Sequence, residues 1–488
     1  MKLYLNKPCL YAFATLCLSV SLFLNPSLAA PPPAYIQLAG LIDLRSTFSD
    51  GELSLETLVR RAKERGFEVV VINDHDRMAM EYGLFPFRKI LKKREERPSI
   101  LKLGADKYLQ AIKQIAQHYP DMILIPGAES APFYYWTGSY LRGTLTAHNW
   151  ERHLLIIGLE DPQDYQHLPL LHNGFSTHYF RQLLPGSMIF LIPLCLSPFL
   201  ILRKGSYRFM GITILLLSSL MLIESHPFKG SPFDQYHGDQ GISPYQELID
   251  YVRSRGGMTF WNHPETRSGI ARKGPIQVNT PPHPEVLIES KGYTGFAVVY
   301  GDRITVTEPG HEWDKLLIDY CRAKRADPPW GISSADFHGE GEAGEKLGNF
   351  PTIFLVKSKT KEEVLRAFEQ GRMYACRAGD NFRRFVLEDF SVSDPTTGSW
   401  GTLGETIISK SKPRIRIKIL SSDQRRYDIR IRIIRSGKLI NTFSGTTPLA
   451  VNFSDDYFQP GEQVYYRIDI PGVLVSNPVF VRFSQDRQ

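Results

Sequence analysis

Polar clusters rich in His, Asp and Glu lie at the ends of the apolar segments of this chain. The clusters are Asp43-Leu44-Arg45 with Ser49-Asp50-Gly51, Asn73-Asp74-His75-Asp76, Gly127-Ala128-Glu129, His153, Asn262-His263-Pro264, Tyr300-Gly301-Asp302 and Ser334-Ala335-Asp336-Phe337-His338. Neutral imidazoles and carboxylates are the ligands that divalent transition metals take from proteins. The sequence therefore predicts a metal site assembled from several separate segments.

Apolar strands alternate with amphipathic helices through most of the chain, which predicts an α/β fold. The predicted strands are 36–44, 68–72, 122–126, 154–158, 258–261, 296–300 and 331–334, and the predicted helices are 54–65, 107–118, 245–255, 311–325 and 361–370. Barrel enzymes keep their chemistry at the C-terminal ends of the strands, and the clusters follow that rule. His153 is the exception, because it precedes its strand.

Residues 1–30 have the pattern of a secretory signal peptide or of an uncleaved anchor. Two further apolar runs, Leu183–Leu202 and Phe209–Ile223, approach the length that spans a bilayer. A buried helical hairpin is the alternative, but basic residues in the short connector favour a transmembrane hairpin over 183–223. We therefore expect the flanking parts on the periplasmic or extracellular side, attached to the cytoplasmic membrane.

The pattern changes at about residue 388, where strictly alternating strands predict a β-sandwich of Ig-like size over 388–488. The α/β domain is then split into 35–182 and 224–385 by the hairpin. The chain of 488 residues has a net charge of +7 with scattered Lys and Arg, which argues against nucleic-acid binding. Cys321 and Cys376 could pair outside the cytoplasm, although sequence alone does not place them together.

The clusters resemble the PHP (polymerase and histidinol phosphatase) family. Its members show, in order, a His-x-His followed by Ser-Asp-Gly, a Thr-Asp-His, a Gly-x-Glu, a His beside a strand, a His-Pro and an Asp-x-His. Here these positions hold Asp43-Leu44-Arg45 with Ser49-Asp50-Gly51, Asn73-Asp74-His75, Gly127-Ala128-Glu129, His153, His263-Pro264 and Asp336-Phe337-His338. Each element alone is weak, but six in the family's order over residues 35–385 make a specific resemblance.

The resemblance implies a distorted (β/α)7 barrel that binds up to three divalent ions (Mn, Fe or Zn) and hydrolyses phosphate esters. Carried over by position, one ion would be held by Asp50, His75 and His338, and a second by Glu129, His153 and His263. The third ion would need the two His-x-His imidazoles with Glu129 and Asp336. Asp43 and Arg45 stand in place of those imidazoles, so two ions are expected.

A guanidinium cannot ligate a cation, because it has only donors and stays charged. In one interpretation Arg45 replaces the third ion and clamps a phosphate, with Asp43 and Asp336 beside it in an active phosphoesterase. In the other, the chain is a pseudoenzyme, a membrane-attached protein that binds a ligand or serves as a scaffold without turnover. We favour the enzyme, acting on a phosphorylated small molecule or envelope component, because the other ligands are all present.

Three further features are assigned more loosely. Asp74 is expected to orient its neighbour His75 rather than to bind metal. The loop after His263 contains three cations, Arg267, Arg272 and Lys273. They lie either in a solvated loop or at the rim of the site, where they would meet a substrate phosphate. The aromatic run Phe133–Trp136 lies either at the mouth of a pocket or at a membrane interface.

Overall fold

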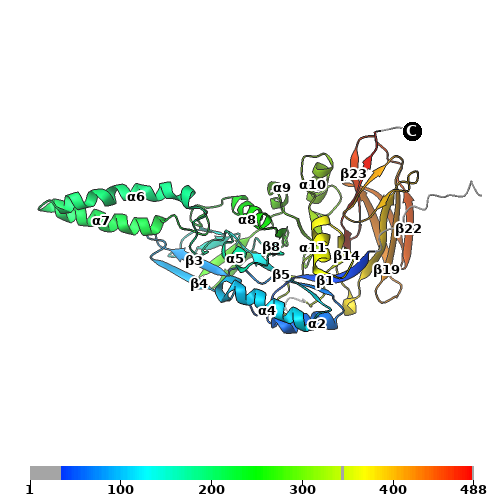
Figure 1. Ribbon diagram of the computed structural model, residues 1–488, viewed down its shortest axis with the longest axis horizontal. Coiled ribbons are helices and arrows are strands. Elements are labelled where there is room, and N and C mark those ends of the chain that lie inside the picture. Colours follow the sequence, from blue (N-terminus) through cyan, green and yellow to red (C-terminus); the bar gives the residue numbers. More distant parts are fainter. Residues whose placement is uncertain (1–34, 342–345, 486–488) are drawn as a thin grey trace, which may run out of the picture.

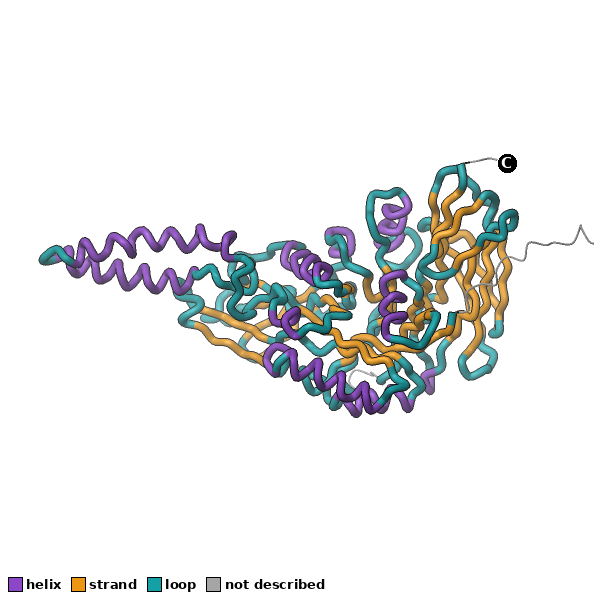
Figure 2. Tube along the Cα trace, in the orientation of Figure 1, coloured by secondary structure: helices purple, strands orange, loops and turns teal. Residues whose placement is uncertain are grey.

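The computed structural model describes residues 35–341 and 346–485. The predicted signal segment, residues 1–30, lies outside this part of the chain. The described chain is a mixed α/β structure, with two long helices projecting from one end and a β-rich module at the other (Figure 1). Figure 2 shows that the curled sheet between these ends carries helices on its outer side.

The curled sheet contains the strands that the sequence predicted, in the order β13-β12-β9-β8-β5-β2-β1. Their bounds are β1 (Ile36–Leu44), β2 (Val69–Ile72), β5 (Ile123–Ser130), β8 (Leu154–Ile157), β9 (Met258–Trp261), β12 (Gly295–Val299) and β13 (Trp330–Ser333). Most of their residues are buried, which explains why they form nearly continuous apolar runs.

One strand departs from the all-parallel arrangement of an ideal (β/α)7 barrel. The pairs β1–β2, β2–β5, β9–β12 and β12–β13 are parallel, whereas β8 runs antiparallel to both β5 and β9. The N-terminal end of β8 therefore lies at the edge where its neighbours have their C-terminal ends. This reversal explains why His153 precedes its strand and still reaches the same edge as the other clusters.

The curl closes where the segment after β13 meets the end of β1. Leu44 and Phe337 form a parallel bridge, Ala335 N–H donates to the Ile42 carbonyl at 3.0 Å, and Arg45 N–H donates to the Phe337 carbonyl at 3.0 Å. On the far side of β1, β14 (Pro351–Val356) pairs antiparallel with it, and β15 (Met373–Cys376) follows β14. The two ends of the predicted domain are thus joined beside the polar clusters.

Amphipathic helices cover the outside of the curl. In α2 (Leu55–Glu64) the buried residues recur at helical spacing, and the Ser54 hydroxyl caps the first turn by accepting from Thr57 N–H. The other helices of this part are α3 (Ile100–Leu103), α4 (Ala105–His118), α5 (Pro162–Gln166), α8 (Ser243–Ser254), α9 (Val286–Glu289), α10 (Glu312–Cys321) and α11 (Lys361–Gln370). The five predicted helices are confirmed, with α10 ending four residues earlier than expected.

Small sheets that the sequence analysis did not predict stand over the strand ends. One is the hairpin of β3 (Ala79–Gly83) and β4 (Lys92–Glu96). The other has the order β10-β11-β7-β6, from β10 (Gly269–Lys273), β11 (Ile276–Thr280), β7 (Thr146–His148) and β6 (Tyr135–Thr137). They were missed because such short strands carry a weak alternation signal.

The two apolar runs form helices α6 (Phe180–Ile201) and α7 (Ser206–Ser225), which pack together and extend away from the rest of the protein (Figures 1 and 2). Their apolar windows have a mean hydropathy of 2.0 and 1.7, and only 11% of each window is buried. By length and composition both can cross a membrane. The buried helical hairpin considered as the alternative is not what the structure shows.

The C-terminal part is a β-sandwich-like module with two sheets. Its strands are β16 (Phe385–Ser393), β17 (Trp400–Gly401), β18 (Thr406–Ser409), β19 (Arg414–Ser421), β20 (Asp428–Arg435), β21 (Lys438–Thr446), β22 (Leu449–Ser454), β23 (Gln463–Ile470), β24 (Leu474–Ser476) and β25 (Val479–Phe483), and the 3-10 turn Asp380–Phe382 precedes them. The alternation in β19 buries its isoleucines and exposes its cations. Its relation to Ig domains stays a prediction.

The module is continuous with the α/β part rather than tethered to it. β24 pairs antiparallel with β15, and the buried Asn477 bonds with Gly331 and the Met373 carbonyl. Cys321 and Cys376 are both free, so the disulfide that the sequence allowed does not form. The burial of both thiols raises their pKa, to about 12 for Cys321.

Candidate metal centre

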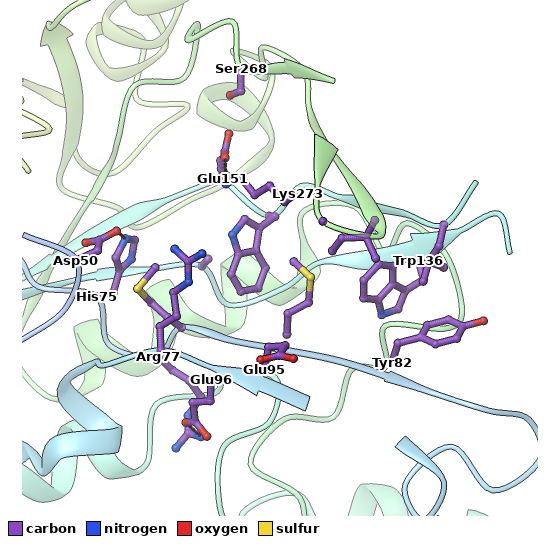
Figure 3. Close-up of a pocket in the computed structure, with 18 of the residues that line it drawn as sticks. Asp50, His75, Arg77, Tyr82, Glu95, Glu96, Trp136, Glu151, Ser268 and Lys273 are labelled. Carbon is purple, nitrogen blue, oxygen red and sulfur yellow. Dashed lines mark hydrogen bonds and ion pairs between the residues drawn. The ribbon is translucent and has the colours of Figure 1, made fainter. Parts of the chain in front are cut away.

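The side chains predicted as ligands come together at one edge of the curled sheet. Arg45 and Asp50 follow β1, His75 follows β2, Glu129 lies near the end of β5, His153 precedes β8, His263 follows β9, and Asp336 and His338 follow β13. All but Glu129 line one cavity of about 1260 Å³, shown in part in Figure 3. Glu129 lies beneath them and is fully buried.

Glu129 is at the centre of the histidines. Its Oε1 lies 2.9 Å from His153 Nδ1 and 3.6 Å from His263 Nε2, and its Oε2 lies 3.5 Å from His75 Nε2. The backbone produces this arrangement, because the residues after β2 continue beside β5 and His75 bridges Glu129 in parallel. One carboxylate can therefore serve ligand groups on both sides of it.

Two sets of residues each offer three potential ligand atoms that lie within 4.8 Å of one another. The first set is His75, Glu129 and His153, and the second is Glu129, His263 and Asp336. Asp50 Oδ2 completes the arrangement, 3.5 Å from His75 Nε2 and 3.7 Å from His338 Nε2. The structure thus brings all the predicted ligands together. His75 lies close to Glu129 and His153 and also to Asp50, with which the resemblance had grouped it beside His338, so the assignment of ligands to individual ions stays a prediction.

The donor set fits a divalent transition metal. It combines imidazole nitrogens with carboxylate oxygens, as Mn, Fe and Zn sites do. Two of these groups, His263 Nδ1 and Asp50 Oδ1, are buried without a hydrogen-bond partner among the described residues. Buried polar atoms normally have hydrogen-bond partners, so two atoms without one are what a site that binds a ligand through them would show. Metal binding itself and the number of ions stay predictions.

Arg45 occupies the middle of the site with its side chain 1% exposed. Its Nη2 donates to Glu129 Oε2, and its Nη1 lies 2.8 Å from Asp336 Oδ1 and 3.6 Å from Asp43 Oδ1. Its Nε lies 3.7 Å from Asp50 Oδ1. The guanidinium therefore faces carboxylates on every nitrogen. Only Nη2 makes a hydrogen bond, whereas Nε and Nη1 are buried without a hydrogen-bond partner among the described residues and Arg45 lines the cavity, so the expected phosphate clamp stays a prediction.

The charge of Arg45 governs the neighbouring carboxylates. Burial by itself would raise the pKa of Glu129, but Arg45 first and His153 second outweigh burial and hold that pKa well below its usual range. Burial by itself would lower the pKa of Arg45, but the charges of Glu129 and Asp43 outweigh burial and raise that pKa above its usual value. Arg45 is thus protonated and Glu129 ionised in the folded protein. A metal ion in the place of Arg45 would likewise keep the carboxylates ionised.

Asp43 is fully buried behind Arg45 and does not face the cavity. Its Oδ2 accepts from Asn262 Nδ2 at 2.8 Å, from the Ser334 hydroxyl at 2.7 Å and from Asp336 N–H at 3.2 Å. The Asn262 amide also donates to Glu129 Oε1 at 2.7 Å. Asp43 therefore fixes the residues around it, and its predicted catalytic role stays a prediction.

Three residues of the site have left-handed backbone. The φ angles are 67° at Asp43, 28° at His263 and 47° at Asp336. Such angles are costly for residues with a Cβ and persist where the surrounding structure enforces them, which is often at functional sites. The fold therefore accepts strain to direct these side chains.

Two histidines of the site, His263 and His75, have a raised pKa. Burial by itself would lower the pKa of His263, but its hydrogen bond to Glu129 and the charge of Asp336 raise the pKa to about 9. The pKa of His75 is raised as well, against burial, mainly by its hydrogen bond to Asp50. A bound metal would take the place of these protons, since only neutral imidazole ligates.

Asp74 has a different task from the one expected. It accepts from Ser46 N–H at 2.8 Å, from the Ser46 hydroxyl at 2.7 Å and from the Ser49 hydroxyl at 2.6 Å. It thus holds the loop that carries Arg45 and Asp50, and not the ring of His75. Asn262 was the important omission of the sequence analysis: it stands next to His263 in its cluster, but no role was assigned to it.

The remaining candidates divide between the cavity and the rest of the fold. Lys273 lines the cavity and lies 3.1 Å from Glu151 Oε1, and Trp136 of the aromatic run lines it as well. Tyr300 is buried elsewhere, where its hydroxyl accepts from Glu265 N–H at 3.0 Å. The cluster around Tyr300 is thus a structural one.

No family model matches the chain, and no curated protein matches its sequence. Among solved structures it is similar to a two-domain protein from Bacteroides vulgatus that contains a predicted PHP-like metal-dependent phosphoesterase, with 13% identity, a TM-score of 0.36, and coverage of 92% of this chain and 95% of that one. A candidate metal-dependent phosphoesterase from Bifidobacterium adolescentis has 15% identity, a TM-score of 0.29, and coverage of 67% and 95%. Similarities this distant carry no argument for this chain, and its function is inferred below from its own residues.

Proposed function

We propose that the chain is a metal-dependent phosphoesterase of the PHP type that acts at a membrane, outside the cytoplasm. The observation that supports this most directly is the convergence of Asp50, His75, Glu129, His153, His263, Asp336 and His338 at one cavity around a buried guanidinium. Four carboxylates without Arg45 would repel one another. With Arg45 at their centre, the remaining ligands are suited to two ions.

The residues of the site have separable tasks in this proposal. When bound, divalent ions polarise a phosphoryl oxygen and make a water molecule more acidic. Glu129 holds histidines on both sides in place, and Arg45 keeps it ionised. Asp336 lines the cavity and is held by Arg45, which, against burial, also lowers the pKa of its carboxyl, so its ionised carboxylate can orient water entering the site by accepting a hydrogen bond. Lys273 at the wall can attract the substrate phosphate.

Membrane attachment is part of the same proposal. α6 and α7 are apolar, mostly exposed and long enough to cross a bilayer as a hairpin. The basic residues Arg203, Lys204 and Arg208 lie at its tip, which suits a cytoplasmic tip. The α/β part and the C-terminal module would then lie together on the opposite, outer side.

The pseudoenzyme remains a second candidate, and one contact favours it. Arg45 Nη2 donates to Glu129 Oε2, the oxygen that also lies 3.5 Å from His75 Nε2. An oxygen shared with a guanidinium is a poorer metal ligand. A protein with this contact could bind a phosphorylated ligand or a partner without hydrolysing it.

Metal content and hydrolysis together decide between these functions. The full chain, purified in detergent without chelators, is measured by elemental mass spectrometry and assayed with p-nitrophenyl phosphate. Glu129→Gln removes the central charge, and Glu363→Gln alters another buried carboxylate, in α11, as the matched control. We expect about two ions per chain and hydrolysis in the wild type and the control, and a roughly 100-fold slower rate with lost metal in Glu129→Gln.

Each other outcome has its own meaning. Metal without hydrolysis would favour the pseudoenzyme. A chain that binds no metal at any tested concentration would refute the metal centre and the proposed function with it.

A further inference from the structure

The cavity at the metal centre is larger than a small phosphorylated metabolite requires. Its volume is about 1260 Å³, whereas pockets of roughly 300–1,000 Å³ enclose drug-sized ligands. The candidate ligands occupy only one end. Figure 3 shows Asp50 and His75 at that end and Tyr82 and Trp136 at the other, with Arg77 and Lys273 between them.

The walls away from the ligands are mostly apolar and aromatic. They include Met80 and Tyr82 of β3, Trp136 of β6, and Leu145, Trp150 and Ile276. The rings are held in place: Tyr82 meets Trp136 edge-on at 5.5 Å between centroids. Charged side chains of β4 also line this part, among them Lys92 and Glu95, but its apolar walls stabilise apolar ligand surface.

The apolar end opens beside exposed hydrophobic side chains. Leu84 and Leu91, from the hairpin of β3 and β4, line the cavity and are each 55% exposed, and Phe85 between them is 81% exposed. Leu141, at the turn between β6 and β7, is 93% exposed. Clusters of exposed apolar residues mark binding surfaces, and a membrane is one of them.

This opening lies at the base of the projecting hairpin. The turn of the β3–β4 hairpin contacts the end of α7, where Lys89 N–H donates to Glu224 Oε2 at 2.7 Å. Figure 1 shows β3 and β4 running toward that base. The same turn carries Arg88 and Lys89, and Lys92 and Lys93 follow on β4, where Lys92 pairs with Glu81 at 2.7 Å and Lys93 with Glu95 at 3.0 Å. Cations beside exposed apolar residues suit the headgroup region of an anionic bilayer.

We propose that the substrate is a membrane lipid with a phosphate monoester headgroup, whose phosphate reaches the metal centre while its chain lies along the apolar wall toward the bilayer. The inference rests on the proposed function and adds its substrate class. In the reaction, water oxygen bonds to phosphorus, the ester P–O bond breaks, and a proton passes to the leaving oxygen. The products are the lipid alcohol and inorganic phosphate.

The test uses tryptophan fluorescence as well as turnover. The six tryptophans include Trp136 and Trp150 in the cavity wall, and α6 and α7 contain none. Full chain in lipid nanodiscs receives either phosphatidate or phosphatidylcholine with brominated acyl chains, which quench nearby tryptophan. Phosphatidate hydrolysis is compared with that of p-nitrophenyl phosphate in the same preparation.

Leu84→Glu places a charge where the chain would enter, and Ile408→Glu is its matched control. Ile408 lies on β18 of the C-terminal module, away from the cavity. Leu84 and Ile408 are 55% and 60% exposed, so we expect the fold to tolerate a charge at either position. We expect brominated phosphatidate to quench more strongly than the choline lipid. Leu84→Glu should weaken that quenching and lower the ratio of phosphatidate to soluble turnover roughly tenfold, and Ile408→Glu should change neither.

The outcomes separate the two proposals. Turnover of p-nitrophenyl phosphate without preferential quenching or turnover of phosphatidate would overturn the lipid inference and keep the phosphoesterase. Preferential quenching without hydrolysis of either compound would keep the lipid site and refute the enzyme. Equal quenching by both lipids without hydrolysis would overturn both.

Discussion

Replacing Arg45 by Met tests whether the guanidinium stands in for a metal ion. Arg45 lies among four carboxylates, with contacts to Glu129 and to Asp336 at 2.8 Å and longer ones to Asp43 and Asp50. Met has a similar length and no charge. In the absence of metal, the buried carboxylates of the variant have lost their counter-charge. In the presence of metal, a cation can occupy the position that the guanidinium fills in the wild type.

The magnitude follows from the burial of the pair. Removing one partner of a buried ion pair costs about 3–5 kcal/mol, and the side chains of Arg45 and Glu129 are 1% and 0% exposed. A ligand present at about 100 times its Kd returns about 2.7 kcal/mol. We therefore expect the variant to lose about 3–5 kcal/mol in EDTA, to recover at least half of this in Mn²⁺, and to bind one more ion per chain than the wild type.

The assay is chemical denaturation of the full chain in detergent, with EDTA or with Mn²⁺, beside elemental mass spectrometry. Arg467→Met is the matched control, because Arg467 is also fully buried and its Nε lies 2.8 Å from Asp314 Oδ1, outside the site. The control should lose similar stability without selective recovery in Mn²⁺. Equal recovery in both variants, or an unchanged ion count in Arg45→Met, would refute the idea that Arg45 replaces an ion.

Three further predictions follow from buried polar groups. Asn262→Leu deprives two site carboxylates of a donor, so Mn²⁺ affinity in calorimetric titration should fall roughly 10–100-fold, and an unchanged affinity would contradict its orienting role. Burial lowers the pKa of His172 from 6.5 to about 3, so the unfolded chain takes up the proton first as pH falls. The stability contributed by the neutral ring is complete above pH 6.5 and should decline by about 2 kcal/mol at pH 5, a decline that urea titrations of His172→Gln should lack. Asn477→Ala breaks three bonds between the C-terminal module and the α/β part and should cost about 3 kcal/mol within one unfolding transition; separate transitions would contradict the shared sheet.

Local pattern was sufficient for the strands of the curl, for the five longer helices that cover it and for the list of candidate ligands. The strands of the curl are short apolar runs between polar turns, and buried strands must have that composition whatever their neighbours are. The helices were predictable from the spacing of apolar residues, as in α2, where Leu55, Leu58, Val59 and Ala62 are buried. The hairpin of α6 and α7 was visible as uninterrupted hydropathy.

The roles within the site depended on tertiary structure. The sequence showed that Arg45 cannot ligate a metal, but its partners come from β5 and from the segment after β13, and only the closure of the sheet brings them to it. The same applies to Asp43, whose neighbours in space turn it away from the cavity.

The direction of strand β8 shows most clearly what could not be predicted from the sequence. The residues around His153 specify a strand, but a strand has the same composition whether it runs parallel or antiparallel to its neighbours. The chain itself determined the identity of the ligands, the apolar strands and the apolar hairpin. The fold decided that β8 is reversed, that His153 therefore meets Glu129, and that the cavity beside them runs toward the hairpin, because these are relations between segments far apart in the sequence.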